Sequence, residues 1–189
     1  MNGHWSTPHE QDAGAGLATY LAACGVRYEQ LRPGSTGVPT VSIVPPSPWT
    51  QVDRGYFRDV YAIWARPPIE GYGWVDNAVL VLIRLTPGAD HIELLTHAVF
   101  DARRLPGWDE IYVEETRYEG YPSCLIAGTY VVDSLRLRAD TRYIVIGDSG
   151  CQYLVQFTIT SQLSSFSEAA GWASKEFDQF KGWWVTLPR

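Results

Sequence analysis

Apolar residues recur at helical spacing in three stretches of the chain. These stretches are residues 12–25, 89–103 and 166–184. In each of them, apolar side chains fall at intervals of three, four and seven residues, which places them on one face of a helix. Gly25 ends the first stretch, and Asp90 stands at the start of the second, where a carboxylate suits the helix dipole. The pattern therefore predicts three amphipathic helices.

Strand-like patterns fill most of the remaining sequence. Residues 56–65 alternate large apolar groups, and residues 74–85 form a nearly continuous apolar run, which is typical of a strand buried on both faces. Four further strand-like stretches, separated by tight turns, are residues 108–118, 123–132, 135–146 and 151–160. Strands joined in this way pair as an antiparallel meander. The whole pattern predicts an α+β fold with one antiparallel β-sheet and helices packed on it.

Composition places the chain among globular proteins. Its 189 residues are 46% hydrophobic and 19% charged, which excludes intrinsic disorder and indicates one domain. We expect residues 1–12 to be a disordered polar tail and residues 13–189 to form the domain. The 15 basic and 21 acidic residues give a net charge of −6. Because nucleic acids and anionic membrane surfaces require clustered Lys and Arg, neither is expected as a partner.

The sequence leads us to expect neither a transmembrane segment nor a secretory leader. The longest aliphatic run, residues 78–83, is far shorter than the roughly 20 residues needed to cross a bilayer. Residues 1–11 lack Lys and Arg and an apolar stretch, so they do not resemble a secretory signal. As written, the sequence favours a cytoplasmic location.

The three cysteines are widely spaced. They show neither a disulfide framework nor zinc-ligand spacing, and we expect most of them to be buried thiols. A pair between Cys124 and Cys151 is the open alternative if the protein is exported.

Three short motifs suggest chemistry, but a structural explanation is favoured for each. Residues 21–24 fit a lipobox, yet they lie on the apolar face of a predicted helix. Residues 147–150 match the surroundings of a protease nucleophile, yet a hairpin turn requires the same residue types. Glu93 and His97 are one helical turn apart, but two ligands do not close a metal site. The hypothesis of an enzyme that uses Glu93, His97 or Asp148 is supported by spacing alone. We therefore expect a non-enzymatic protein without metal or cofactor.

Aromatic residues are unusually frequent and several fall in predicted loops. The chain has eight Trp, eleven Tyr and six Phe, and it contains a Pro-rich turn at residues 45–49 and a Gly-Tyr-Gly-Trp loop at residues 71–74. Exposed aromatic rings stack on sugars, cover acyl chains or anchor protein interfaces, although they also plug the ends of sandwiches. The candidate ligand-binding residues are therefore Trp49, Tyr56, Tyr72, Trp74 and Trp108.

The order of short motifs resembles the LpqN/LpqT family of mycobacterial lipoproteins. The first predicted helix ends in Gly25, and a PG…G-V-P-T linker and a Pro-rich loop that ends in Trp49 follow it. Similar turn and strand motifs come later, as LPGW at residues 105–108, AGTY at residues 127–130 and YLVQ at residues 153–156. The resemblance covers roughly residues 13–185, and its motifs are structural rather than catalytic.

The resemblance implies a PsbP-like α/β/α sandwich and a non-enzymatic role in the actinobacterial cell envelope. It implies a binding module for a glycolipid, a sugar or a protein partner, and the alternative is a structural or secretion/assembly interaction protein acting in the cytoplasm. Family members typically carry a signal peptide and a lipidated cysteine ahead of the first helix, whereas sixteen residues with neither feature precede it here. Location in the cell envelope, or secretion, is thus the alternative to the cytoplasm.

Overall fold

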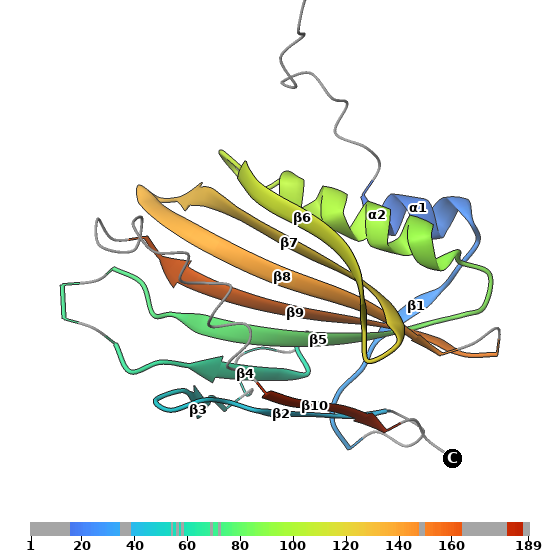
Figure 1. Cartoon of the computed structure of the whole chain (residues 1–189), viewed down its shortest axis with the longest axis horizontal. Coiled ribbons are helices and arrows are strands. Elements are labelled where there is room, and N and C mark those ends of the chain that lie inside the picture. The colour runs from blue at the N-terminus through green and yellow to red at the C-terminus, as the bar shows by residue number, and fades with distance from the viewer. Residues whose placement is uncertain are drawn as a thin grey trace, which may run out of the picture.

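The protein is described by a computed structural model, which is drawn in Figure 1. The described residues are 16–34, 39–53, 55, 57, 59–68, 70–71, 73–147, 150–163 and 181–186. The predicted tail, residues 1–12, lies outside them, so the division between tail and domain stays a prediction.

An antiparallel sheet of eight strands forms the centre of the molecule (Figure 1). Seven of the strands follow the order β3-β4-β5-β9-β8-β7-β6, and β1 pairs with β5 beside β4. The strands are β1 (Tyr28–Gln30), β3 (Thr50–Gln51), β4 (Ala62–Ala65), β5 (Asn77–Leu85), β6 (Asp109–Tyr118), β7 (Tyr121–Val132), β8 (Leu135–Gly147) and β9 (Gln152–Gln162). The predicted meander is confirmed, because β6, β7, β8 and β9 pair in sequence order.

Two different layers cover the two faces of this sheet. Both helices, α1 (Leu17–Ala23) and α2 (His91–Arg103), pack on one face (Figure 1). A two-stranded sheet of β2 (Thr40–Val44) and β10 (Lys181–Thr186) lies at the opposite face. The α+β prediction is confirmed. No helix in the described part of the chain is long and apolar enough to cross a membrane.

Each face of the sheet carries its own apolar core. The helix-side core consists of Leu21, Val26, Ile83, Leu85, Ala89, Leu94, Leu95, Ala98, Val99, Ala102, Cys124, Ile126, Tyr143, Val145 and Leu154. The strand-side core consists of Leu31, Val41, Ile43, Trp49, Tyr61, Ala62, Trp64, Ala78, Leu80, Leu82, Leu125, Ile144, Ile146, Tyr153, Val155, Phe157 and Ile159. In β9, Tyr153 and Val155 belong to the strand-side core and Leu154 between them belongs to the helix-side core, which explains the continuous apolar run at residues 153–155.

The predicted end of the third helix, at residue 184, is wrong. Residues 166–180 lie outside the described residues, but residues 181–184 belong to strand β10. Their sequence, with two Trp followed by Val and Thr, has the aromatic and β-branched side chains that favour strands, and it pairs with β2. Smaller differences are that β1 was not expected and that β4 occupies only residues 62–65 of the strand predicted over 56–65.

The cysteines differ from one another in burial. Cys124 is buried in the helix-side core, whereas Cys24 is exposed because α1 ends at Ala23 and Cys24 is its C-cap. The prediction of burial is therefore wrong for Cys24. Cys151 is half-buried and packs against the strand-side core. Cys124 and Cys151 lie against opposite faces of the sheet, and both are free thiols.

Cys124 makes the stability of the fold sensitive to alkaline pH. Burial raises the pKa of its thiol from the ordinary value of 9.0 to about 11. Above pH 9 the unfolded chain loses a proton that the folded chain keeps, so the free energy of unfolding falls by about 2 kcal/mol as the pH approaches 11. Urea unfolding over this pH range should show a smaller loss for Cys124→Ala than for the unaltered protein. Equal pH slopes would contradict the assignment to this thiol.

Candidate ligand-binding site

A cavity of about 280 Å³ lies beside the helices, on the face of the sheet that they cover. Leu17 of α1 and Ala98, Asp101 and Ala102 of α2 form one wall. Strands β7, β8 and β9 form the floor, whose polar residues are Tyr130, Thr141, Tyr143, Gln156, Thr158 and Thr160. Five of these six residues carry hydroxyl groups, so the floor is unusually rich in groups that both donate and accept hydrogen bonds.

The sequence of β9 explains the polar floor. Side chains two residues apart on a strand share a face, so Gln156, Thr158 and Thr160 continue the face on which Leu154 contacts the helices. The opposite face of β9 remains apolar along the same length. The helix-side face therefore changes from apolar to polar at the edge of the cavity.

Hydrogen bonds fix several of the floor residues. The hydroxyl groups of Thr141 and Thr158 are 3.0 Å apart, and Gln156 Nε2 donates to Thr158 Oγ1 over 3.4 Å. Tyr130 is hydrogen-bonded to Thr160. The Tyr143 hydroxyl has no hydrogen-bond partner among the described residues. Burial raises the pKa of both tyrosines. Each hydroxyl group therefore stays protonated at neutral pH and can donate a hydrogen bond to a ligand.

Asp101 stands where α1 begins, at the wall of the cavity. Its carboxylate accepts a hydrogen bond from the backbone N–H of Leu17 over 3.2 Å, and Arg104 lies 3.9 Å from it. Gly16 is packed against both side chains, so that any side chain at position 16 would overlap them. The start of α1 therefore lies in contact with the cavity wall.

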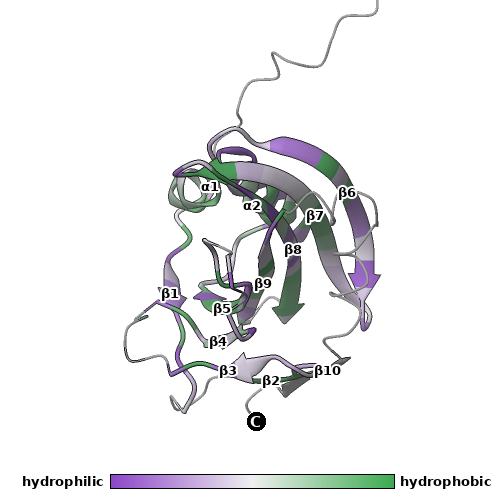
Figure 2. Ribbon diagram, turned by 90° about the vertical axis from the view of Figure 1, so that its left-hand side faces the viewer, coloured by the Kyte–Doolittle hydropathy of each residue, from purple (hydrophilic) through white to green (hydrophobic). Residues whose placement is uncertain are grey.

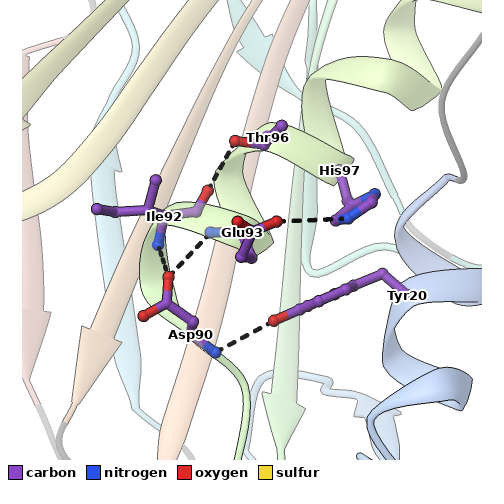
Figure 3. A network of polar contacts seen from close by, with 6 residues as sticks. All are labelled: Tyr20, Asp90, Ile92, Glu93, Thr96 and His97. Atoms are coloured by element: carbon purple, nitrogen blue, oxygen red, sulfur yellow. Dashed lines mark hydrogen bonds and ion pairs between the residues drawn. The ribbon is translucent and has the colours of Figure 1, made fainter. Parts of the chain in front are cut away.

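A polar network joins α1 to the first turns of α2 (Figure 3). Asp90 caps α2 by accepting hydrogen bonds from the backbone N–H groups of Ile92 and Glu93 over 2.9 and 3.1 Å, which confirms its expected position. The backbone N–H of Asp90 donates to the Tyr20 hydroxyl over 3.2 Å. The Tyr20 ring stacks on the His97 ring with 4.5 Å between centroids. The network thus holds the two helices together.

Glu93 and His97, the predicted pair of potential ligands, belong to this network. Glu93 Oε2 and His97 Nε2 are 3.7 Å apart, and the His97 ring packs against Tyr20 and Phe100. No group of three or more His, Cys, Asp or Glu side chains that could hold a metal ion occurs within the described residues. The geometry gives this pair a structural role at the helix interface.

The aromatic residues assigned from the sequence do not form one surface. Trp49 is only 5% exposed and belongs to the strand-side core, with the Arg66 guanidinium 5.4 Å from its ring centroid. Trp74 is half-buried, and Tyr56 and Tyr72 lie outside the described residues. Trp108 packs against the helix-side core, on the other face of the sheet from Trp49. A binding role for these five residues stays a prediction.

The floor of the cavity was not identified from the sequence. Its signal is the alternation in residues 155–160, where polar residues occupy every second position between large apolar ones. Such alternation indicates a strand with one polar face. This alternation is difficult to recognise in the sequence, because residues 152–155 and 143–146 of the same two strands are buried on both faces.

Known proteins support one family assignment. Residues 14–180 match the model of a family described as "Probable lipoprotein LpqN". The proline-rich 28 kDa antigen of Mycobacterium tuberculosis is 28% identical over 148 residues, which are 78% of this chain and 47% of the antigen. The putative lipoprotein LpqT of Mycobacterium leprae is 32% identical over 148 residues, covering 77% of this chain and 66% of LpqT. The chain thus spans about half the length of the antigen.

A solved structure supports the fold. The crystal structure of LpqN, which is described as involved in cell envelope biogenesis of Mycobacterium tuberculosis, has a TM-score of 0.78 to this chain. The match covers 90% of this chain and 97% of LpqN, with 16% sequence identity. It shows that the two chains share their fold, while the PsbP-like label stays a prediction.

Trp108 and Gly128 form a close contact on the helix-side face of the sheet. The Trp108 ring lies against Gly128, so a methyl group added there would overlap the ring. We expect Gly128→Ala to displace Trp108 and to lower the free energy of unfolding by about 1–3 kcal/mol. Urea unfolding measures this change. In the control variant Gly55→Ala, the nearest atom to the new methyl group is 3.7 Å away, and a change below about 0.5 kcal/mol is expected. Equal effects of the two substitutions would contradict the contact.

Proposed function

The chain belongs to the LpqN family of probable lipoproteins, and on that premise we propose that it is a non-enzymatic binding module for a glycolipid of the cell envelope. The cavity between the helices and the sheet would hold the sugar headgroup. The protein would act in the cell envelope, as the lipoprotein names of its relatives suggest.

The observation that carries this proposal is the hydroxyl-rich floor of the cavity. Sugar hydroxyl groups donate and accept hydrogen bonds, and the hydroxyl groups of Thr and Tyr match them in both roles. Tyr143 and Thr158 come from adjacent strands and can contact neighbouring hydroxyl groups of one ring. A volume of about 280 Å³ is just below the range of roughly 300–1,000 Å³ for small-molecule sites. It suits one headgroup better than a whole glycolipid.

The walls of the cavity supply apolar surface beside the polar floor. Leu17 and Leu105 are both half-buried, and Ala98 and Ala102 line the cavity with them. Apolar groups at these positions would contact the first methylene groups of an acyl chain attached to the sugar. The site therefore combines the two kinds of surface that a glycolipid presents.

Trp108 is the aromatic candidate that relates most directly to this site. It covers Gly128, and Tyr130 follows on the same face of β7 two residues later. We propose that Trp108 supports the floor of the cavity rather than contacting the ligand. The envelope role rests on the description of Mycobacterium tuberculosis LpqN as involved in cell envelope biogenesis.

Soluble alkyl glycosides test the proposed headgroup site. We expect a glucoside or disaccharide with a chain of about eight carbons, kept below its micelle concentration, to bind in calorimetric titrations. Tyr143→Phe and Thr158→Val each remove one hydroxyl group, so each should weaken binding by about threefold to tenfold. Tyr28→Phe is the matched control, because Tyr28 is 55% exposed on β1 and does not line the cavity.

A sulfobetaine with the same alkyl chain separates headgroup recognition from simple apolar binding. If the sulfobetaine binds as tightly as the glycosides, or if the two cavity variants bind glycosides like the unaltered protein, the headgroup assignment is wrong. Thermal unfolding of each variant shows whether it retains the fold.

A further inference from the structure

Strand β6 is an edge strand of the main sheet in the part of the chain that the structure describes. It is the last strand in the sheet order, and Figure 2 shows it at the right-hand rim of the molecule. Its ten residues extend over about 33 Å. In the described part of the chain, β7 is its sole strand partner, so the outer side of β6 has backbone groups without a strand to pair with.

The pairing with β7 identifies the outward-facing backbone groups. Tyr118 pairs with Tyr121 across a two-residue turn whose residues both have positive φ, and such a turn is flanked by a hydrogen-bonded pair. Arg117 pairs with Pro122, which has no N–H and therefore suits a non-hydrogen-bonded pair. Hydrogen-bonded and non-hydrogen-bonded pairs alternate. The N–H and C=O groups of Val113, Glu115 and Arg117 therefore point away from β7.

A groove runs beside this edge, between α2 and β6. Its volume is about 540 Å³, which is larger than that of the proposed sugar cavity. Ile92 and Leu95 line it from α2, while Glu115 and Arg117 line it from β6. The Ile92 side chain is 66% exposed. The groove thus offers apolar and charged surface next to the free backbone groups.

The charge of the edge strand is predominantly negative. Asp109 and Glu110 lie at its start and form ion pairs with Arg136 and Arg103, over 3.7 and 2.7 Å. Glu114 and Glu115 have no ion-pair partner among the described residues, and they project to opposite faces of the strand. Two carboxylates without a cation partner therefore flank the outward-facing backbone groups.

We propose that β6 binds an extended segment of a partner protein in which basic and apolar residues alternate. The segment would add as a ninth strand beside Val113, Glu115 and Arg117. Its apolar side chains would enter the groove against Ile92 and Leu95, and its Lys or Arg side chains, which project to the opposite face of the added strand, would pair with Glu114. A second copy of β6 is the other possible occupant, and the dependence of amide exchange on protein concentration distinguishes it.

Amide hydrogen exchange tests the geometry directly. The probe is a capped peptide of about ten residues in which Lys alternates with Val and Thr. We expect the peptide to slow exchange at the amides of Val113, Glu115 and Arg117. The amides of Glu114 and Thr116 already pair with β7, so their exchange should change much less. A peptide with Glu in place of Lys should give no protection.

Two variants separate the backbone contribution from the charge contribution. Glu115→Pro removes an outward N–H that the ladder to β7 does not use, and it should abolish peptide binding. The double variant Glu114→Gln with Glu115→Gln keeps the backbone intact and should weaken binding by about threefold or more, with a smaller dependence on salt. The control, Glu70→Gln with Asp133→Asn, removes the same charge from exposed turns elsewhere and should bind like the unaltered protein.

Three results would overturn the proposal. The first is equal protection by the acidic peptide, and the second is protection outside β6 and its groove. The third is slowed exchange in β6 that depends on protein concentration without peptide, because it would assign the edge to a second copy. Tyr143→Phe should leave peptide binding unchanged, so failure of this proposal is distinguishable from failure of the sugar site.

Discussion

A β-strand rises further per residue than an α-helix, and this difference determines how much of the sheet the helices can cover. Strand β8 and helix α2 both have thirteen residues. A strand rises about 3.3 Å per residue and a helix 1.5 Å, so β8 spans about 43 Å and α2 about 20 Å. The helix layer, which runs along the strands in Figure 1, therefore leaves part of their length uncovered. At the edge of the helix layer the chain places Thr141, Thr158 and Thr160, whose side chains line the cavity beside α2.

On the opposite face of β8, polar side chains pair with one another. Asp140, 1% exposed, is held by Arg138 through two hydrogen bonds of 2.8 and 3.0 Å. The Tyr112 hydroxyl donates a third bond to this carboxylate over 3.3 Å. A buried charge needs such partners, because desolvation without them is costly. On one face of β8 the polar groups thus satisfy one another, and on the other they line a cavity.

Structural features that depend on local sequence pattern can be predicted from this sequence, whereas features that depend on tertiary contacts cannot. The meander and α2 follow from alternation, turn residues and a capping aspartate, and these were identified correctly. Trp49 was assigned to a projecting loop because Pro-rich turns are usually exposed, yet its ring is part of the strand-side core. The cavity could not be predicted because Tyr130, Thr141 and Thr158 come from three strands. Their proximity depends on register, and their accessibility depends on where α2 ends.

The contact between Gly16 and Asp101 places the first described residue of the domain at the cavity wall. Gly16 is packed against Asp101, and both Asp101 and Leu17 line the cavity. The polypeptide therefore joins the domain at the cavity wall. A force that acts on the residues preceding Gly16 would therefore reach the cavity wall first, through the contact with Asp101.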